Sequence, residues 1–283
     1  MSRHTGLALL VLLSGAEQAP ERSSLVDCLA RKPLARWVLP PDLREISGLV
    51  FTGDGRLLAH DDERARVVEL DYRSGREVKA FSLGTAARVG SIVARGDFEA
   101  IAVVADRIFL VTSDGVLYQA REGRDGQVVP FAVTRTGAGA RCEVEGLEYE
   151  PRDKALLFLC KTARVPRFLR TITILRWSLE GERWLVPGRI AIPLGASFRR
   201  TYGNDFRPSD LARDPVTGRY LVIAGLNRAA VELTPEGRLV GAGFLGKHHP
   251  QAEGVAVARD GTIVVSDEGG HGLAHLTVYA CAR

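Results

Sequence analysis

The chain repeats one short pattern five times, and this repetition restricts the fold more than any other feature of the sequence. Each copy has a polar opening, an alternating strand, a turn and an apolar strand, as in CEVEGLEYEPRDKALLFL from Cys142 to Leu159. A serine or glutamate opens each copy, at successive intervals of 52, 46, 64 and 44 residues: Ser47, Glu99, Glu145, Ser209 and Glu253. Strand-rich repeats of this length are typical of a β-propeller, in which each small sheet buries its faces against its neighbours.

The strand pattern predicts an all-β fold, a five-bladed β-propeller of four-stranded antiparallel blades that fills residues 35–283 as a single domain. The fifth copy holds only three strands, so we expect a strand at Ala35–Leu39 to complete that blade and close the ring. In the second copy we expect the fourth strand at 127–133, and in the third copy insertions at 162–170 and 195–206. A six-bladed ring is the alternative, and it would need the third copy to contain two sheets.

The first residues have the pattern of an export signal. Arg3 and His4 precede an apolar run over Leu7–Leu13, and small residues follow at Ser14–Ala16. This run is too short for a stable membrane anchor, so we expect a signal peptide over residues 1–16 and an exported protein, periplasmic or secreted. Residues 17–34 are expected to form an irregular lead-in. The alternative for the apolar run is a buried N-terminal helix.

The four cysteines agree with an oxidising compartment, where disulfides persist. Cys142 and Cys160 flank the first hairpin of the third copy, whereas Cys28 precedes the first strand and Cys281 follows the last. A bond between Cys28 and Cys281 would staple the ring shut, although the sequence leaves the connectivity open. No group of cysteines and histidines has the spacing of a zinc site.

The composition is that of a soluble globular protein, with 46% hydrophobic and 25% charged residues. The formal charge of +4 is mildly basic, but the arginines are scattered and no nucleic-acid-binding motif is present. We therefore expect a monomer that binds no nucleic acid and whose partner is a small anionic ligand.

The opening residues of the five copies predict a polar ring at the axis, because the first strand of each blade lines the channel of a propeller. The ring would contain three carboxylates and two hydroxyls, with Asp210 beside Ser209. Crowded carboxylates need protons, basic groups or a cation to neutralise them, and an all-oxygen set suits Ca²⁺ better than zinc. The alternative is a purely architectural role, in which each side chain caps backbone NH groups of the next blade.

The loops on the same face predict a rim around this ring. They add acidic, basic and polar side chains: Asp61, Asp62, Lys161, Arg199, Arg200, Arg207, Asn227, His248, Asp267 and His271. A cation under a guanidinium rim suits a phosphate ester or a carboxylate, since the metal polarises one oxygen and arginines bind the others. The alternative is an ordinary solvated loop surface.

The histidines raise one further alternative. His271 and His275 are four residues apart, and with His248 and His249 they could bind a transition metal. Glycines around His271 indicate a loop, however, and not the helix on which that spacing would be useful. His60, in the second strand of the first blade, is expected to be a packed or rim histidine.

The segments EISGLVF, CEVEGLEYEP, RPSDLARDPVTGRYLVIAGLNRAAVEL and QAEGVAVARDGTIVVSDE resemble the SdiA-regulated family of exported bacterial propellers, relatives of the NHL-repeat propellers. The resemblance covers about Ala35 to Tyr279 and implies a five-bladed propeller with a bound calcium ion. It also implies, by position, a set of residues near the metal: Glu99, Glu145 and Glu253, with Asp61 or Asp62. The second copy departs from the family pattern because it opens with Glu-Ala in place of Glu-Gly.

The Glu-Gly-Leu openings are also similar to those of exported propellers described as phytase-like esterases. That resemblance implies Ca²⁺ as the electrophile and a metal-bound water as the nucleophile, with Glu145 or His248 as the base.

The sequence as a whole predicts a calcium-associated module that binds a ligand or a surface. A metal-dependent hydrolase of the phosphoesterase, phytase-like or lactonase type is the alternative, and a protein scaffold that uses the basic insertion at 162–170 is a third.

Overall fold

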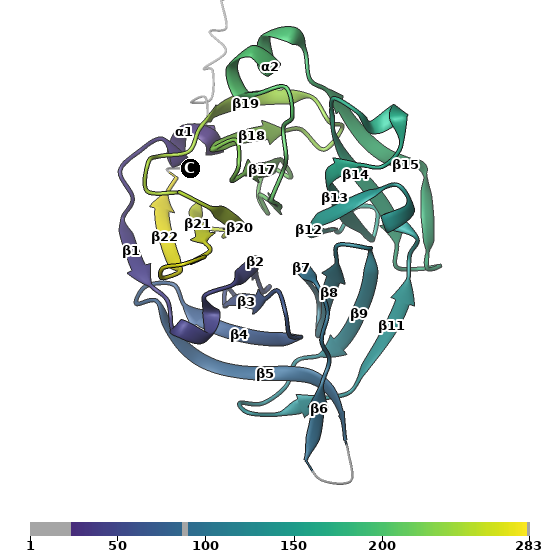
Figure 1. The fold of residues 1–283 in the computed structure, drawn as a ribbon, viewed down its shortest axis with the longest axis vertical. Coiled ribbons are helices and arrows are strands. Elements are labelled where there is room, and N and C mark those ends of the chain that lie inside the picture. Colours follow the sequence, from purple (N-terminus) through teal and green to yellow (C-terminus); the bar gives the residue numbers. More distant parts are fainter. Residues whose placement is uncertain (1–23, 87–89, 282–283) are drawn as a thin grey trace, which may run out of the picture.

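A computed structural model describes residues 24–86 and 90–281, which form a ring of five antiparallel four-stranded blades around a central axis (Figure 1). The five-bladed prediction is confirmed. Blade one contains β2 (Ile46–Phe51), β3 (Leu57–Asp61), β4 (Arg66–Asp71) and β5 (Arg76–Ala86). Blade two contains β7 (Phe98–Val104), β8 (Arg107–Thr112), β9 (Val116–Arg121) and β11 (Phe131–Arg135). Blade three contains β12 (Cys142–Glu150), β13 (Ala155–Ala163), β14 (Thr171–Ser178) and β15 (Arg183–Pro193).

The remaining blades complete the circle. Blade four contains β16 (Asp210–Arg213), β17 (Tyr220–Ala224), β18 (Ala229–Leu233) and β19 (Leu239–Phe244). Blade five contains β20 (Ala252–Val257), β21 (Thr262–Asp267), β22 (His275–Ala280) and, as predicted, the early strand β1 (Ala35–Val38). β1 pairs antiparallel with β22 in a register that sets Ala35 opposite Val278 and Val38 opposite His275. The two ends of the chain thus share one sheet, and the ring has no open edge at the closure.

The second blade differs from the prediction in its outer strand. The segment expected as one strand at 127–133 is divided at Pro130 into β10 (Val128–Val129) and β11. β10 pairs in parallel with β5 of blade one, whereas β11 pairs antiparallel with β9. Proline has no NH to donate and interrupts the ladder, so the chain changes sheets at this point. β5 also continues beyond its predicted end and forms a projecting hairpin with β6 (Ser91–Val93) (Figure 1).

The lead-in also differs from the prediction, because part of it is helical. α1 (Leu25–Leu29) begins after Ser24, whose hydroxyl accepts a hydrogen bond from Val26 N and donates one to Glu232 of β18 at 2.5 Å. Its apolar side chains are buried against blades four and five. The predicted signal peptide at 1–16 lies outside the described residues. Within the described part of the chain, no helix is long and apolar enough to cross a membrane.

The insertions of blade three hold short helical segments. η3 (Pro166–Phe168) follows β13, and α2 (Ala196–Tyr202) follows β15. The other short helices are η1 (Pro41–Leu43), before β2, and η2 (Ala138–Ala140), before β12.

Both predicted disulfides are present. Cys142 is bonded to Cys160 across the first hairpin of blade three, and Cys28 is bonded to Cys281 across a separation of 253 residues. The second bond joins α1 to the segment after the last strand and so fastens the two ends of the ring to each other.

The core lies between the blades. Among the described residues the buried apolar side chains form five clusters, and each cluster joins two neighbouring blades. This distribution is what a ring of repeats requires, because no blade can bury both of its faces alone. Glycines allow the first strands to approach closely near the axis. A Cβ on Gly254 would lie 3.0 Å from Leu49 Cγ, and one on Gly146 would lie 2.8 Å from Leu211 Cδ2.

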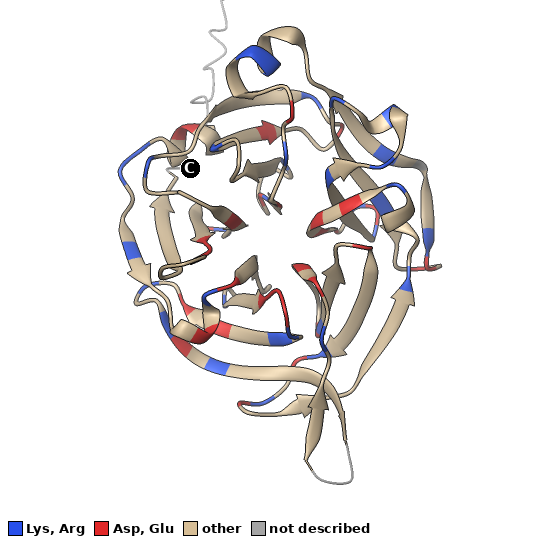
Figure 2. Ribbon diagram, in the orientation of Figure 1, with Lys and Arg blue, Asp and Glu red and all other residues tan. Residues whose placement is uncertain are grey.

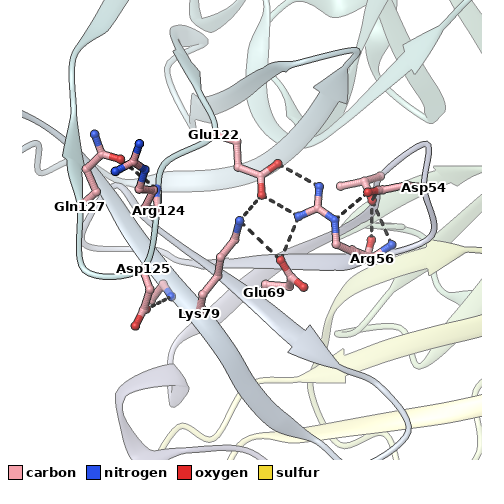
Figure 3. Close-up of polar contacts among 10 residues, drawn as sticks. Asp54, Arg56, Glu69, Lys79, Glu122, Arg124, Asp125 and Gln127 are labelled. Carbon is pink, nitrogen blue, oxygen red and sulfur yellow. Dashed lines mark hydrogen bonds and ion pairs between the residues drawn. The ribbon is translucent and has the colours of Figure 1, made fainter.

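Ion pairs add to the contact between blades one and two (Figure 3). Arg56 Nη1 lies 2.6 Å from Glu122 Oε1 and 2.9 Å from Glu69 Oε2, and Lys79 also pairs with Glu122. The network connects the turn before β3, together with β4 and β5, to the segment after β9, close to the parallel pair of β5 and β10. It therefore stabilises the same contact between blades one and two that β10 and β11 form.

Candidate functional site

The ring residues of all five blades meet in one cavity at a mouth of the central channel. Ribbon segments of acidic residues, red in Figure 2, lie at the inner ends of strands that surround the axis. The cavity has a volume of about 230 Å³, and each blade contributes the residue that the repeats predicted: Ser47, Glu99, Glu145, Ser209 and Glu253. Their convergence follows from the repeat itself, because the same position on each first strand meets the axis at the same height. We call this cavity the acidic mouth.

Loops bring further carboxylates to the acidic mouth. Glu45 precedes β2, Asp62 follows β3 and Glu268 follows β21, and all three line the cavity with Gln251. Asp62 had been predicted from its acidic loop, whereas Glu45 and Glu268 had not been singled out. The signal for both was present in the sequence, since Glu268 adjoins Asp267 of the predicted rim and Glu45 lies two residues before Ser47 of the predicted ring.

A single basic side chain lies among the acidic groups that line the cavity. Lys161 of β13 donates a hydrogen bond from Nζ to Glu145 Oε1, and its Nζ lies 3.9 Å from Glu143 Oε1. The Glu145 side chain is only 4% exposed, so this ion pair is largely withdrawn from solvent. Lys161 therefore neutralises one carboxylate of the ring and leaves the others without a basic partner in the cavity.

Several carboxyls of the cavity are driven toward the protonated state, whereas the pKa of Glu45 is lowered by its hydrogen bond with Glu268. Burial, reinforced by the charge of Glu145, raises the pKa of Glu99 to about 9. Burial also raises the pKa of Glu145 to about 7, against the opposing effect of Lys161. The pKa of Glu268 rises to about 8 through burial and its hydrogen bond with Glu45, and that of Asp62 rises to about 6 through burial and the charge of Glu45. Such a site favours any cation that can replace these protons.

One oxygen of the acidic mouth has no hydrogen-bond partner. Asp62 Oδ1 is buried and unpaired, whereas Ser47 Oγ donates to Glu99 O at 3.3 Å and Ser209 Oγ accepts from Gly225 N at 3.0 Å. An unpaired buried acceptor loses hydration without compensation, so it is a natural position for a cation to contact.

Two predicted metal-region residues lie elsewhere. Asp210 is buried and accepts hydrogen bonds from Leu211 N at 2.7 Å and Val255 N at 2.9 Å, so it joins blade four to blade five. Asp61 is buried behind its loop, where it accepts from Arg64 N at 2.7 Å and pairs with the Arg64 guanidinium at 3.3 Å. Neither residue lines the acidic mouth.

The predicted basic rim is not assembled around the cavity. Arg199 and Arg200 lie on α2, where Arg199 donates to Leu194 O, and Arg207 pairs with Asp205 at 2.7 Å. Asn227 holds the same loop, because its amide donates to Tyr202 O at 2.9 Å and its Oδ1 accepts from Arg207 N. Of the residues predicted to bind a ligand, only Lys161 is among the described residues that line the acidic mouth.

The predicted histidines separate into different environments. His271 is in an exposed loop, and His60 is fully buried beside Gly48, where burial lowers its pKa to about 4. His248 and Asp267 belong to a hydrogen-bonded cluster between blades four and five, outside the cavity lining.

The donor set of the acidic mouth fits a hard cation in its chemistry. Every potential ligand is a carboxylate, hydroxyl or amide oxygen, which is the set that Ca²⁺ prefers. The side chains are not drawn together around one point, however. Within the described residues, no group of three or more His, Cys, Asp or Glu side chains is arranged to hold a metal ion. An ion would have to draw the carboxylates together and displace the Lys161 amine from Glu145.

No protein-family model matches the chain, and no curated protein matches it in sequence. Solved structures match its fold. Glutaminyl cyclase from Myxococcus xanthus is 17% identical, with a TM-score of 0.56, over 87% of this chain and 94% of that one. The PQQ-bound aldose sugar dehydrogenase from Streptomyces coelicolor is 14% identical, with a TM-score of 0.57, over 88% of this chain and 97% of that one. At such identities the similarity establishes the β-propeller fold and no particular activity.

Proposed function

We propose that this propeller is a ligand-binding or surface-interaction module whose acidic mouth binds a hard cation, and that the cation is Ca²⁺. One observation carries the proposal: all five blades deliver a ring residue into one cavity that holds six carboxyl groups and one amine. A purely architectural ring would not need the additional carboxyls of Glu45, Asp62 and Glu268, because these come from loops.

The residues that would hold the ion are those with oxygens directed at the cavity. We assign the carboxylates of Glu99, Glu145 and Glu253 to it, with Asp62 as the acceptor that lacks any other partner. Ca²⁺ accepts six to eight oxygen ligands in variable geometry, so hydroxyls and water can complete its coordination. The bound ion would supply positive charge where the free protein relies on protons, and it would release Lys161 from Glu145.

A small anionic ligand is the partner we propose for the loaded site. The cavity by itself repels anions, because carboxyl groups outnumber its single lysine. With Ca²⁺ in place, the ion and the released Lys161 amine could contact an anion together. The predicted hydrolase finds no support in the arrangement of side chains, since no arginine is among the described residues that line the mouth.

We also propose that the chain is exported by a signal peptide at residues 1–16 and belongs to the SdiA-regulated family. The two disulfides support export, because such bonds persist outside reducing compartments. The repeat openings are the feature that supports the family.

The test is thermal unfolding of the mature protein over a series of free Ca²⁺ concentrations. At about 100 times the dissociation constant, the ion should stabilise the fold by about 2.7 kcal/mol. Glu145→Gln should abolish most of this effect, because it removes a charged ligand while keeping the side-chain shape. Glu180→Gln is the matched control, since Glu180 is an exposed glutamate paired with Lys154. An absence of stabilisation in the wild type, or equal stabilisation in Glu145→Gln, would reject the calcium site.

A further inference from the structure

A second group of titratable side chains lies between blades four and five, outside the lining of the acidic mouth. We call it the His–Tyr cluster, and it comprises His248 and His249 before β20, Asp267 at the end of β21 and Tyr279 on β22. His249, Asp267 and Tyr279 are completely buried, whereas His248 is partly exposed. The cluster does not depend on the proposed function of the acidic mouth.

The contacts within the cluster converge on one oxygen. The Tyr279 hydroxyl lies 2.5 Å from His248 Nε2 and 2.6 Å from His249 Nε2. His249 Nδ1 lies 2.7 Å from Asp267 Oδ2, and Asp267 Oδ1 accepts a hydrogen bond from Gln251 N at 3.3 Å. Two imidazole nitrogens and a phenol oxygen are therefore directed at one small region.

The number of protons that these groups carry determines which atoms donate and which accept hydrogen bonds. An ionised Asp267 can only accept, so the Nδ1–H of His249 donates to it. A neutral His249 then has a lone pair at Nε2, which accepts the single hydroxyl proton of Tyr279. His248 must in turn donate its Nε2–H to the phenol oxygen. A change of tautomer that moves the His248 proton from Nε2 to Nδ1, together with release of one proton from Tyr279 to solvent, would leave a lone pair on each of the two Nε2 atoms and a negative charge on the phenol oxygen between them.

We propose that His248 Nε2, His249 Nε2 and the Tyr279 oxygen form a binding site for a divalent transition metal of the Zn²⁺ type. Imidazole nitrogens and an anionic oxygen are suitable ligands for such an ion, at about 2.0–2.2 Å. The donor atoms would have to separate by less than about 1 Å from their present distances to surround a metal at that length.

Asp267 supports this site through His249. Metal-binding histidines commonly donate their second NH to a carboxylate, which fixes the tautomer and makes the ligand nitrogen more basic. The geometry at His249 matches that arrangement, with the carboxylate on Nδ1 and the free lone pair on Nε2. The third proposed ligand is the phenol oxygen of Tyr279.

The surrounding charge also permits the site. Burial and the charge of Asp267 raise the pKa of the Tyr279 phenol above its ordinary value, and Arg36 of β1 lowers it in part. Arg36 opposes the approach of a cation, but it favours the phenolate that the cation requires. The Asp267 carboxylate and a Tyr279 phenolate would together balance the two charges of the ion. Access is through His248, the member of the cluster that reaches the surface.

The experiment is a titration of tag-free, chelator-treated protein with Co²⁺, followed by visible absorption, and with Zn²⁺, followed by calorimetry. Both are done in excess Ca²⁺, so that the acidic mouth does not contribute. The wild type should bind one metal with a d–d spectrum of mixed nitrogen and oxygen ligation. Tyr279→Phe and His248→Gln should each weaken binding at least tenfold, and Asp267→Asn should weaken it by about 10- to 100-fold.

Two variants serve as controls. His271→Gln removes a histidine of the exposed loop outside the cluster, and Glu145→Gln alters the acidic mouth; both should retain the wild-type spectrum and affinity. Far-UV circular dichroism checks that each variant is folded, and Tyr279→Phe, which loses only a hydroxyl, keeps the test valid if Asp267→Asn does not fold. An absence of binding by the wild type, or binding that persists in both Tyr279→Phe and His248→Gln, would overturn the proposal.

Discussion

Lys161 is the residue on which the charge balance of the acidic mouth depends. It is the single amine among the carboxyl groups lining the cavity, and it already occupies the position beside Glu145 that a cation would take. The same side chain therefore stabilises the free protein and competes with any ion.

Replacing Lys161 by methionine should separate these two effects. Without Ca²⁺ the variant should lose about 1–2 kcal/mol of unfolding free energy, because Glu145 would be left buried without its partner while Lys161 itself is partly solvated. Its affinity for Ca²⁺ should rise severalfold, since no amine has to be displaced. Denaturant unfolding and calorimetric titration measure the two quantities. Lys154→Met, at an exposed lysine, should change neither; weaker Ca²⁺ binding by Lys161→Met would contradict the competition.

The repeat explains why the ring could be predicted residue by residue. Equivalent positions of equivalent strands must meet at the axis, and all five ring residues do so. Asp210 could not be assigned in this way, because adjacent residues of a strand point to opposite faces. Ser209 faces the channel, so its neighbour is directed into the contact with blade five. The predicted arginine rim does not surround the cavity, because the positions of loop residues follow no repeat and Arg207 forms an ion pair with Asp205.

At the scale of elements, carboxylates tie neighbouring first strands together. Glu148 of β12 accepts a hydrogen bond from Arg213 N of β16 at 2.8 Å, and Asp210 of β16 accepts one from Val255 N of β20 at 2.9 Å. In both contacts a backbone NH of one blade donates a hydrogen bond to a carboxylate of the preceding blade. The architectural role that was considered for the ring residues is thus shared with nearby carboxylates, and the ring residue Ser47 has part of it through its hydrogen bond to Glu99 O of the next blade.

The Glu148 contact should make stability depend on pH. Burial raises the pKa of Glu148 to about 7, although its NH donors act in the opposite direction. In the unfolded chain this group ionises near its ordinary pKa, so unfolding releases a proton between about pH 4.5 and pH 7. The contribution of Glu148 to stability is therefore greatest below this range and falls, by roughly 1–3 kcal/mol, as the pH rises through it.

Glu148→Gln provides the measurement. Denaturant unfolding at several pH values should show a flatter curve for the variant, with its largest deficit in stability at low pH. Glu180→Gln should keep the wild-type slope, because that residue is exposed. Parallel pH curves for the wild type and Glu148→Gln would show that the carboxyl does not titrate as described.

Strands were predicted well where the alternation of apolar and polar residues agrees with the positions of the turns. They were predicted poorly where one segment pairs with two different sheets. In blade one, Gly55 and Gly75 mark two of the turns between strands, but residues 127–133 are an almost continuous apolar run that reads as a single strand. Pro130 marks the break in this run, whereas the sheet that each half joins depends on the position of blade one, which local sequence does not encode. The helix at Leu25–Leu29 was obscured for the same reason, since its apolar face is defined only by the blades that it covers.

For the whole molecule, closure of the ring depends on two links between its ends. One is the pairing of β1 with β22, and the other is the Cys28–Cys281 disulfide. A bond that closes a long loop removes more conformational freedom from the unfolded chain than one that closes a short loop.

The two disulfides should therefore differ in their effect on stability. Replacing both Cys28 and Cys281 by serine should lower the unfolding free energy by about 5 kcal/mol, whereas the same change at Cys142 and Cys160 should lower it by about 3 kcal/mol. The difference follows from separations of 253 and 18 residues. Denaturant unfolding followed by tryptophan fluorescence compares the variants under identical conditions. An equal or larger loss for the Cys142 and Cys160 variant would mean that loop length does not determine the ranking.

The pairing of β1 with β22 also imposes an order in time. β1 precedes the other strands of the ring in the sequence and β22 follows them, so the closing strand leaves the ribosome before the edge that it must join. Until β22 has been made, β1 has no sheet to enter and blade five lacks its outer half. Closure is therefore the last step in assembling the ring, and a chain that stops before residue 275 cannot complete it.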